Sequence, residues 1–326
     1  MFSLKFTTKA CAAMLLLGSS VLHADTMVLR SADTHSADYP TVKAVEYMSE
    51  LLHKWTAGDL SIDVYHSRQL GEEKDTIEQT RFGVIDMNRI NMAPLNNLIP
   101  ETAIPSLPYV FRSTEHMRSV ADGPLGAEIL AAFEEHGMIG LAFYDSGARS
   151  FYNSVRSVTT PADLKGLKIR VQKSDLFIAM INALGANATP MPFGEVYSAL
   201  QTGVIDGAEN NWPSYESTKH FEVAKHYALD QHSMSPEVLV MSKKSWDKLS
   251  LEQQVLVKAA AQASVVKMRE LWDARVNASR AIVEANGNDI VQVDKQAFID
   301  AMGPVYTQFV TDDKLRDLLR RIQAAK

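Results

Sequence analysis

The chain has 326 residues, of which 46% are hydrophobic and 22% charged, and its formal net charge is −6. This composition is typical of a globular protein, and the length suffices for two domains of ordinary size. The acidic balance argues against a nucleic-acid-binding surface, so no nucleic-acid partner is expected.

The first 24 residues have the layout of a secretory signal peptide. Lys5 and Lys9 precede a short apolar run at 14–17, and small residues lead to Ala24. The run is too short for a permanent membrane anchor. A buried first helix is the alternative, less favoured because no acidic residue occurs before position 25. Cleavage would also remove Cys11, the only cysteine. We therefore expect an exported mature chain without disulfides or thiolate chemistry.

The next hundred residues alternate between strand and helix patterns. Strands are predicted at 26–32, 60–66 and 84–90, and helices at 41–56 and 71–83. The first helix has apolar residues at helical spacing, and the second has an acidic first turn that suits the helix dipole. The order β-α-β-α-β is typical of an α/β domain with a mostly parallel sheet.

The same order returns later in the chain. After a proline-rich stretch at 99–111 and helical segments at about 114–121 and 124–136, the pattern predicts strands and helices in turn. One long strand-like run is expected at 138–154 and strands at 167–172 and 204–210, with a helix start at Thr160 and helices at 174–186 and 189–203. The sequence Gly-Val-Ile-Asp occurs at 83–86 and again at 203–206. Two similar α/β lobes are therefore predicted, with the residues that follow their strands lining a shared cleft.

The C-terminal part differs from both repeats. Residues 251–286 contain neither proline nor glycine, which predicts one unusually long helix. A coiled coil is the alternative, but the apolar positions do not form a clean heptad. A helix lying along both lobes fits better, followed by a charged helical segment that runs to Lys326.

Two arginines are the candidate ligand-binding cations. Arg170 lies at the C-terminal end of the strand 167–172, and its guanidinium could pair with a carboxylate. An exposed arginine on a half-buried strand is the alternative. Arg149 lies among small residues that would let a ligand approach the backbone. For Arg149 the alternative is a surface residue that braces the chain between the lobes.

Polar side chains near predicted strand ends could bind hydroxyl groups. These candidates are Asn91, Asn210, Asn211, His35, Asp38 and Glu73. Amide side chains both donate and accept hydrogen bonds, which suits a sugar. Turn formation is the alternative for the asparagine pair, helix capping for Asp38, and a place at a helix N-terminus for Glu73.

Enzyme signatures are missing from the sequence. It contains no Walker loop, GxGxxG, GxSxG or HExxH motif, and its nine histidines are scattered. No catalytic residue, cofactor or metal site is therefore predicted.

Several blocks resemble the extracytoplasmic substrate-binding proteins of TRAP (tripartite ATP-independent periplasmic) transporters. They include "HSRQLGEEKDTIEQTRFGVIDM", "GARSFYNS", "TTPADLKGLKIRVQKS" and "PMPFGEVYSALQTGVIDGAEN", in this order. The resemblance covers essentially the whole chain after residue 24. It implies a periplasmic monomer with two hinged α/β lobes and a long helix spanning both, and a permease with small and large membrane subunits as partner. Lobe I is expected at 25–146 plus about 235–274, and lobe II at 147–234 plus about 275–326.

The resemblance also implies ligand contacts. Arg170 would pair with the ligand carboxylate, and Arg149 and Asn210 would be further contacts. The stretches "DTHSADYPTVKAVEYM" and "ENNW" are similar to the branch that binds hexuronates such as glucuronate and galacturonate. Hydroxyl groups would then be bound by the remaining candidates, His35, Asp38, Glu73, Asn91 and Asn211. The alternatives are a C4-dicarboxylate or keto acid as ligand, an exported enzyme acting on sugar acids, or a ligand-sensing partner of a membrane receptor.

Overall fold

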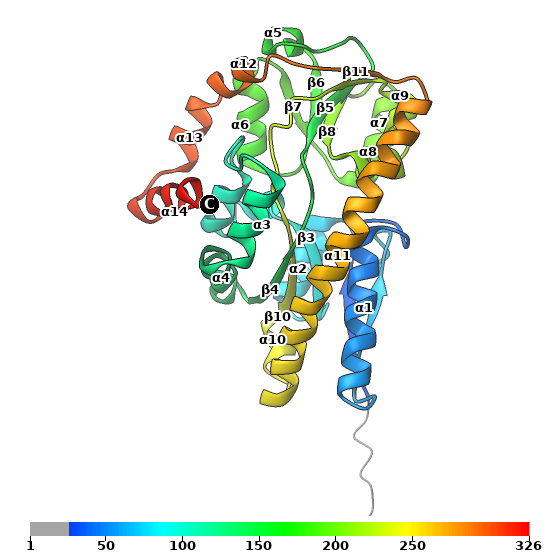
Figure 1. Cartoon of the computed structure of the whole chain (residues 1–326), viewed down its shortest axis with the longest axis vertical. Helices are drawn as coiled ribbons and strands as arrows, with labels where there is room; N and C mark the ends of the chain where they lie inside the picture. The colour runs from blue at the N-terminus through cyan, green and yellow to red at the C-terminus, as the bar shows by residue number, and fades with distance from the viewer. Residues whose placement is uncertain (1–25, 326) are drawn as a thin grey trace, which may run out of the picture.

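The structure is a computed structural model that describes residues 26–325, so the predicted signal peptide and Cys11 lie outside the described residues. The described chain forms two α/β halves, each built on its own sheet (Figure 1). The first sheet has the strand order β2-β1-β3-β10-β4, and the second has the order β11-β9-β5-β8-β6-β7. The predicted two-lobed α/β architecture is confirmed. Over residues 26–325, none of the helices combines the length and the apolar character that a bilayer crossing requires.

The first half follows the predicted order. It consists of β1 (Met27–Ala32), α1 (Pro40–Trp55), β2 (Leu60–Tyr65), α2 (Glu73–Arg81) and β3 (Met87–Asn91). Strand β1 pairs in parallel with both β2 and β3. The sheet is completed by β10 (Glu237–Ser242), which lies antiparallel between β3 and β4 (Met138–Tyr144). Strand β10 comes from far along the chain and was not predicted.

The second half repeats this plan with an additional strand. Its sheet strands and the helices between them are β5 (Ser150–Asn153), α5 (Pro161–Leu164), β6 (Lys168–Val171), α6 (Asp175–Ala183), β7 (Asn187–Pro190), α7 (Val196–Gln201), β8 (Gly207–Asn210), α8 (Trp212–Ser217), β9 (His226–Ala228) and β11 (Asp289–Val291). The prediction of a helix at 189–203 is wrong at its start. Strand β7 and a 3₁₀ helix, η4 (Phe193–Glu195), occupy that stretch, because Pro190 and Pro192 lack the backbone N–H that a helix needs.

The two Gly-Val-Ile-Asp repeats form the same corner in both halves. In each, the glycine ends the preceding helix in a left-handed conformation, with φ of 76° and 71°, and the isoleucine is fully buried. The aspartate then accepts a backbone N–H from the neighbouring strand: Asp86 from Arg30 at 2.9 Å, and Asp206 from Lys168 at 2.8 Å. Strands β3 and β8 begin only after these residues, so the repeats lie at the amino ends of the strands, away from the predicted cleft.

The long helix α11 (Leu251–Ala285) has 35 residues and runs along both halves (Figure 1). It packs against α1 in the first half and α8 in the second, as predicted. The chain also crosses between the sheets at 145–149 and at 229–236, where Arg149 and Ser233 form an antiparallel bridge. These two crossings have the position expected of hinge strands.

The remaining helices complete the surface of both halves. They are η1 (Ala93–Leu95), η2 (Pro100–Ser106), α3 (Thr114–Asp122), α4 (Pro124–Ala131), η3 (Glu134–His136), α9 (His220–Val223), α10 (Lys243–Trp246), α12 (Lys295–Asp300), α13 (Gly303–Phe309) and α14 (Asp313–Ala324). Helix α13 packs against α6, whereas α14 packs against η2 and α4. The C-terminal segment, which the prediction groups with lobe II, therefore contacts both halves.

Candidate functional site

A small polar cavity lies where the two halves meet, at the carboxyl ends of strands from both sheets. Six of the eight predicted ligand-binding residues line it: Arg170, Arg149, Asn210, Asn91, Glu73 and His35. Sequence reasoning missed the other six residues of the lining, which are Thr34, Arg89, Gln172, Phe193, Ser214 and Glu237.

Arg170 is the one guanidinium of this cavity that has no carboxylate partner within residues 26–325. Its side chain is buried, with 3% exposed, at the end of β6. Both Nε and Nη2 donate to the carbonyl oxygen of Met191, at 3.0 and 2.8 Å. Burial lowers the pKa of Arg170, and the more distant Glu209 opposes this only in part. The side chain is thus a fixed, buried cation, held through Nε and Nη2 at the lining of the cavity.

Arg149 is held by a buried network of alternating charges. Its Nε and Nη2 donate to the two carboxylate oxygens of Glu209 at 2.6 and 2.8 Å, and Nη1 donates to Asn210 Oδ1 at 2.9 Å. Burial disfavours the Glu209 carboxylate, but Arg149 and His232 outweigh burial and lower its pKa to about 2. Burial likewise opposes charge on His232, yet Asp230 and Glu209 raise its pKa to about 9. Arg149 therefore reaches the cavity with its charge already compensated.

A third buried guanidinium, Arg89, lies in the wall formed by the first half. It binds both oxygens of Asp33, and its Nη1 donates to Glu237 at 2.6 Å and to Glu73 at 3.4 Å. Burial raises the pKa of Glu73 to about 7; Glu237 adds to this effect, and Arg89 opposes it. Glu73 Oε1 also accepts the backbone N–H of Asn91 at 2.9 Å. One cation here meets three carboxylates.

Aromatic rings from both halves close the cavity. The imidazole of His35 stacks on Tyr39 with centroids 3.7 Å apart, and Phe193 of the second half meets it edge-on at 5.5 Å. Burial, with the charge of Arg89, lowers the pKa of His35 to about 3, so its ring is neutral. The buried Gln172 Oε1 has no hydrogen-bond partner in the described chain. It is an acceptor available to a ligand hydroxyl.

The structure does not bring Asp38 or Asn211 to the cavity. The Asp38 carboxylate lies at the surface, where it accepts hydrogen bonds from Ser36 Oγ at 2.7 Å and Arg275 Nη1 at 2.9 Å. Asn211 is the N-cap of α8: its Oδ1 accepts the N–H of Ser214 at 2.8 Å, and its Nδ2 donates to the Ser146 carbonyl at 2.8 Å. For Asn211 the structure favours the turn-forming alternative.

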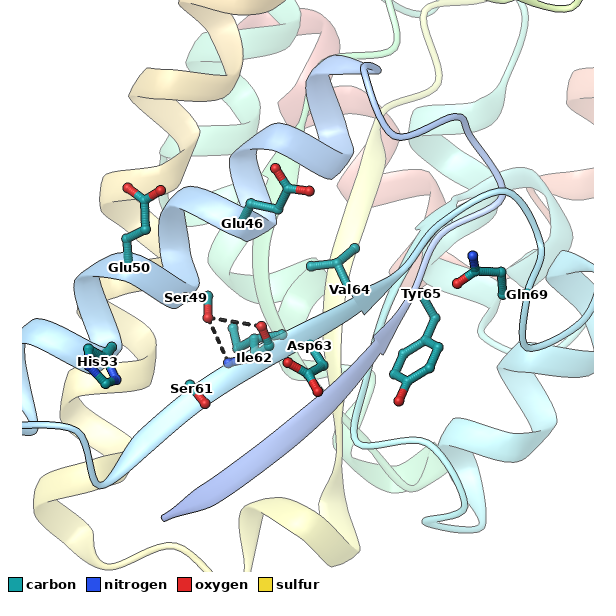
Figure 2. Close-up of a pocket in the computed structure, with 10 residues that line it drawn as sticks. All are labelled: Glu46, Ser49, Glu50, His53, Ser61, Ile62, Asp63, Val64, Tyr65 and Gln69. Atoms are coloured by element: carbon teal, nitrogen blue, oxygen red, sulfur yellow. Dashed lines mark hydrogen bonds between the residues drawn. The ribbon is translucent and has the colours of Figure 1, made fainter.

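A wider, open depression of about 620 Å³ lies between α1 and β2. Figure 2 shows the residues that line it. Ser49 of α1 donates to the Ile62 carbonyl at 2.9 Å and accepts the Ile62 N–H at 2.8 Å, so this edge of β2 is already hydrogen-bonded. The depression belongs to one half alone and contains none of the predicted site residues. It has the features of a surface groove between a helix and an edge strand. Among residues 26–325, no cluster of three or more His, Cys, Asp or Glu side chains suits a metal ion.

Comparison with known proteins gives consistent matches over nearly the whole chain. Residues 31–313 match the model of a family described as bacterial extracellular solute-binding protein, family 7. The 2,3-diketo-L-gulonate-binding periplasmic protein of Escherichia coli is 35% identical over 293 residues, which is 89% of either chain.

Two solved structures are similar in both sequence and fold. A TRAP periplasmic solute-binding protein from a Bradyrhizobium species, in complex with α/β-D-galacturonate, is 59% identical with a TM-score of 0.91, over 92% of this chain and 100% of that one. A TRAP periplasmic solute-binding protein from Roseobacter denitrificans, with bound β-D-glucuronate, is 44% identical with a TM-score of 0.90, over the same shares of the two chains.

Proposed function

The chain belongs to family 7 of the bacterial extracellular solute-binding proteins, and on this premise we propose that it binds a hexuronate such as galacturonate or glucuronate. The protein then works in the periplasm and delivers the sugar acid to the membrane subunits of a TRAP permease. It carries out no chemical step on the ligand.

The observation that supports this proposal most strongly is the unpaired guanidinium of Arg170. A buried charge without a counter-ion is costly, and a guanidinium fork matches a carboxylate closely. A ligand carboxylate is therefore the natural partner of this side chain. Arg149 and Asn210, fixed to each other at 2.9 Å, stand beside it as further donors.

Hydroxyl groups suit the rest of the lining. Glu73, Gln172 and Glu237 all present acceptor oxygens to the cavity. His35 is neutral, and its ring and that of Phe193 offer flat apolar faces. A pyranose ring with one carboxylate and several hydroxyls matches this lining, in which one unpaired cation would bind the carboxylate and several acceptor oxygens would bind the hydroxyls.

Capture requires the two halves to close on the solute. The cavity is lined by residues from both sheets, so a ligand that touches both walls favours the closed arrangement over the open one. A dissociation constant near micromolar corresponds to about 8 kcal/mol, which one charge-assisted pair and several hydrogen bonds in a dry cleft can supply.

The test is a thermal-shift panel on the purified mature protein, followed by calorimetry. The panel contains galacturonate, glucuronate, 2,3-diketogulonate, succinate and the neutral sugar galactose. We expect the uronates to give the largest rise in melting temperature and galactose to give none. A larger shift with succinate or diketogulonate would replace the uronate proposal with the corresponding alternative. Turnover of a uronate by the protein would contradict the binding role.

A further inference from the structure

The two walls of the cavity carry opposite charge excesses. In the wall of the second half, Glu209 compensates Arg149, which leaves the charge of Arg170 uncompensated. In the wall of the first half, Arg89 faces three carboxylates, from Asp33, Glu73 and Glu237. One wall of the cavity is thus positive and the other negative. A ligand with a carboxylate at one end and hydroxyl groups at the other therefore has one favoured orientation.

Arg89 cannot act as a second carboxylate receptor. Its Nε and Nη2 bind Asp33, Nη2 also donates to Thr34 Oγ1 at 2.8 Å, and Nη1 binds Glu237 and Glu73. These five hydrogen bonds engage all five N–H groups of the guanidinium with acceptors of the protein itself. Acceptor capacity remains free instead: within residues 26–325, Glu73 Oε2 has no hydrogen-bond partner, and Glu73 lines the cavity.

We propose that the carboxylates of Glu73 and Glu237 form a selectivity element that accepts ligand hydroxyls and rejects a second carboxylate. The inference rests on the proposed function, because it assumes a ligand carboxylate at Arg170. A hydroxyl at this wall donates a hydrogen bond to Glu73, whereas a carboxylate has no proton to donate and lies among three like charges. The protein therefore selects monocarboxylate sugar acids and discriminates against solutes with a carboxylate at both ends.

The raised pKa of Glu73 is consistent with the three carboxylates that lie close together in this wall. The groups that face it are Arg89 on β3, Glu237 on β10, Asp33 after β1 and, from the opposite wall, Arg170. Burial raises the pKa of Glu73 to about 7, and Glu237 and Asp33 push it in the same direction. A further anion at this wall would favour proton uptake by Glu73. Binding of a dicarboxylate should therefore improve as the pH falls below 7.

The decisive comparison uses two solutes of the same shape. Galactonate and galactarate have the same open six-carbon chain and differ only in whether one end is a hydroxymethyl group or a carboxylate. Their ability to displace galacturonate is measured by calorimetry on the wild type, on Glu73→Gln and on the control Glu72→Gln. Glu72 is the neighbouring residue, pairs with Arg68 and does not line the cavity.

We expect the wild type to bind galactonate at least about 10-fold more tightly than galactarate. This ratio of affinities should fall about 5-fold or more in Glu73→Gln, and it should not change in Glu72→Gln. On the unmodified protein, the ratio should also be smaller near pH 6 than near pH 8, a test that requires no variant to fold. Equal or better binding of galactarate by the wild type would overturn the inference. So would a Glu73→Gln variant that binds galacturonate without any relative gain for galactarate. Failure of the wild type to bind galacturonate at all would instead remove the proposed function, and this inference with it.

Discussion

Gly194 brings the second half of the protein against an ion pair of the first half. It lies in η4, and a Cβ atom at this position would be 2.4 Å from Glu72 Oε1 and 2.7 Å from Arg68 Nε. Arg68 and Glu72 are themselves paired at 3.3 Å. Gly194 is not among the glycines with positive φ, so an alanine would be unstrained in its own backbone. The Gly194→Ala substitution therefore perturbs the contact across the cleft without straining the backbone at residue 194.

The expected size of the effect follows from the atoms that must move. The Arg68 and Glu72 side chains are 35% and 27% exposed, so both can rotate away from a new methyl group. This loses a partly exposed ion pair, worth about 0.2–1 kcal/mol, and leaves residual crowding of about 1 kcal/mol. The closed arrangement thus becomes less favourable by about 1–2 kcal/mol, which weakens ligand binding by about 5- to 30-fold.

Calorimetric titration with galacturonate measures this loss. Gly303→Ala is the matched control, because Gly303 has no atom within 4 Å of its virtual Cβ and no positive φ. Since the crowding exists only across the closed cleft, the melting temperature of the ligand-free Gly194→Ala variant should not fall. In a background that carries Arg68→Ala and Glu72→Ala, the effect should shrink to less than about twofold. An undiminished effect in that background, or normal affinity in the single variant, would refute the reasoning.

Three further predictions concern charge. Arg170→Lys should weaken uronate binding by about 30- to 1000-fold in calorimetry, because an ammonium cannot reproduce the guanidinium fork; Arg316→Lys, on the exposed face of α14, should have no effect. Burial in the folded protein raises the pKa of Glu73 from 4.5 to about 7. The free energy of unfolding should therefore decrease as the pH rises from about 4.5 to 7. In urea unfolding, Glu73→Gln should match the wild type near pH 4 and exceed it by up to about 3 kcal/mol near pH 8; a constant difference would contradict this sign. Histidine NMR should show His220 neutral down to about pH 4, because burial lowers its pKa to about 3, and His232 still protonated near pH 8, because its pKa is about 9.

The fold was largely predictable because its signals are local. Helical spacing, acidic first turns and the absence of proline over 251–286 are features of short stretches, and they located α1, α2 and α11. Strand β10 depends instead on pairing with β3 and β4, which a single stretch does not reveal. The helix predicted at 189–203 does not begin at 189, because Pro190 and Pro192 lack the backbone N–H groups that a helix needs.

The lining of the cavity was most directly predictable where a residue lies at a strand end. Arg170, Asn210 and Asn91 end or follow strands, and the rule for parallel sheets placed them at the cleft. The buried carboxylates of Asp33, Glu209 and Glu237 could not be found in this way, because their partners are distant in sequence. Arg89 and Glu237 are 148 positions apart, and Arg149 and Glu209 are 60 apart. A charged residue within a buried strand, as Arg89 is in β3, was the one local sign that such a network exists.

If the proposed function holds, the distribution of these charges also determines which solutes can close the cleft. Arg170 is fixed to Met191, and Arg149 to Glu209, within the second half alone, so a carboxylate can bind there before closure. A ligand shifts the equilibrium toward closure only by contacts that the open arrangement lacks. Those contacts are to the first half, at His35, Glu73 and Asn91. A simple carboxylate such as acetate would therefore bind the second half without closing the cleft, and the hydroxyl groups of the solute provide the free energy of closure.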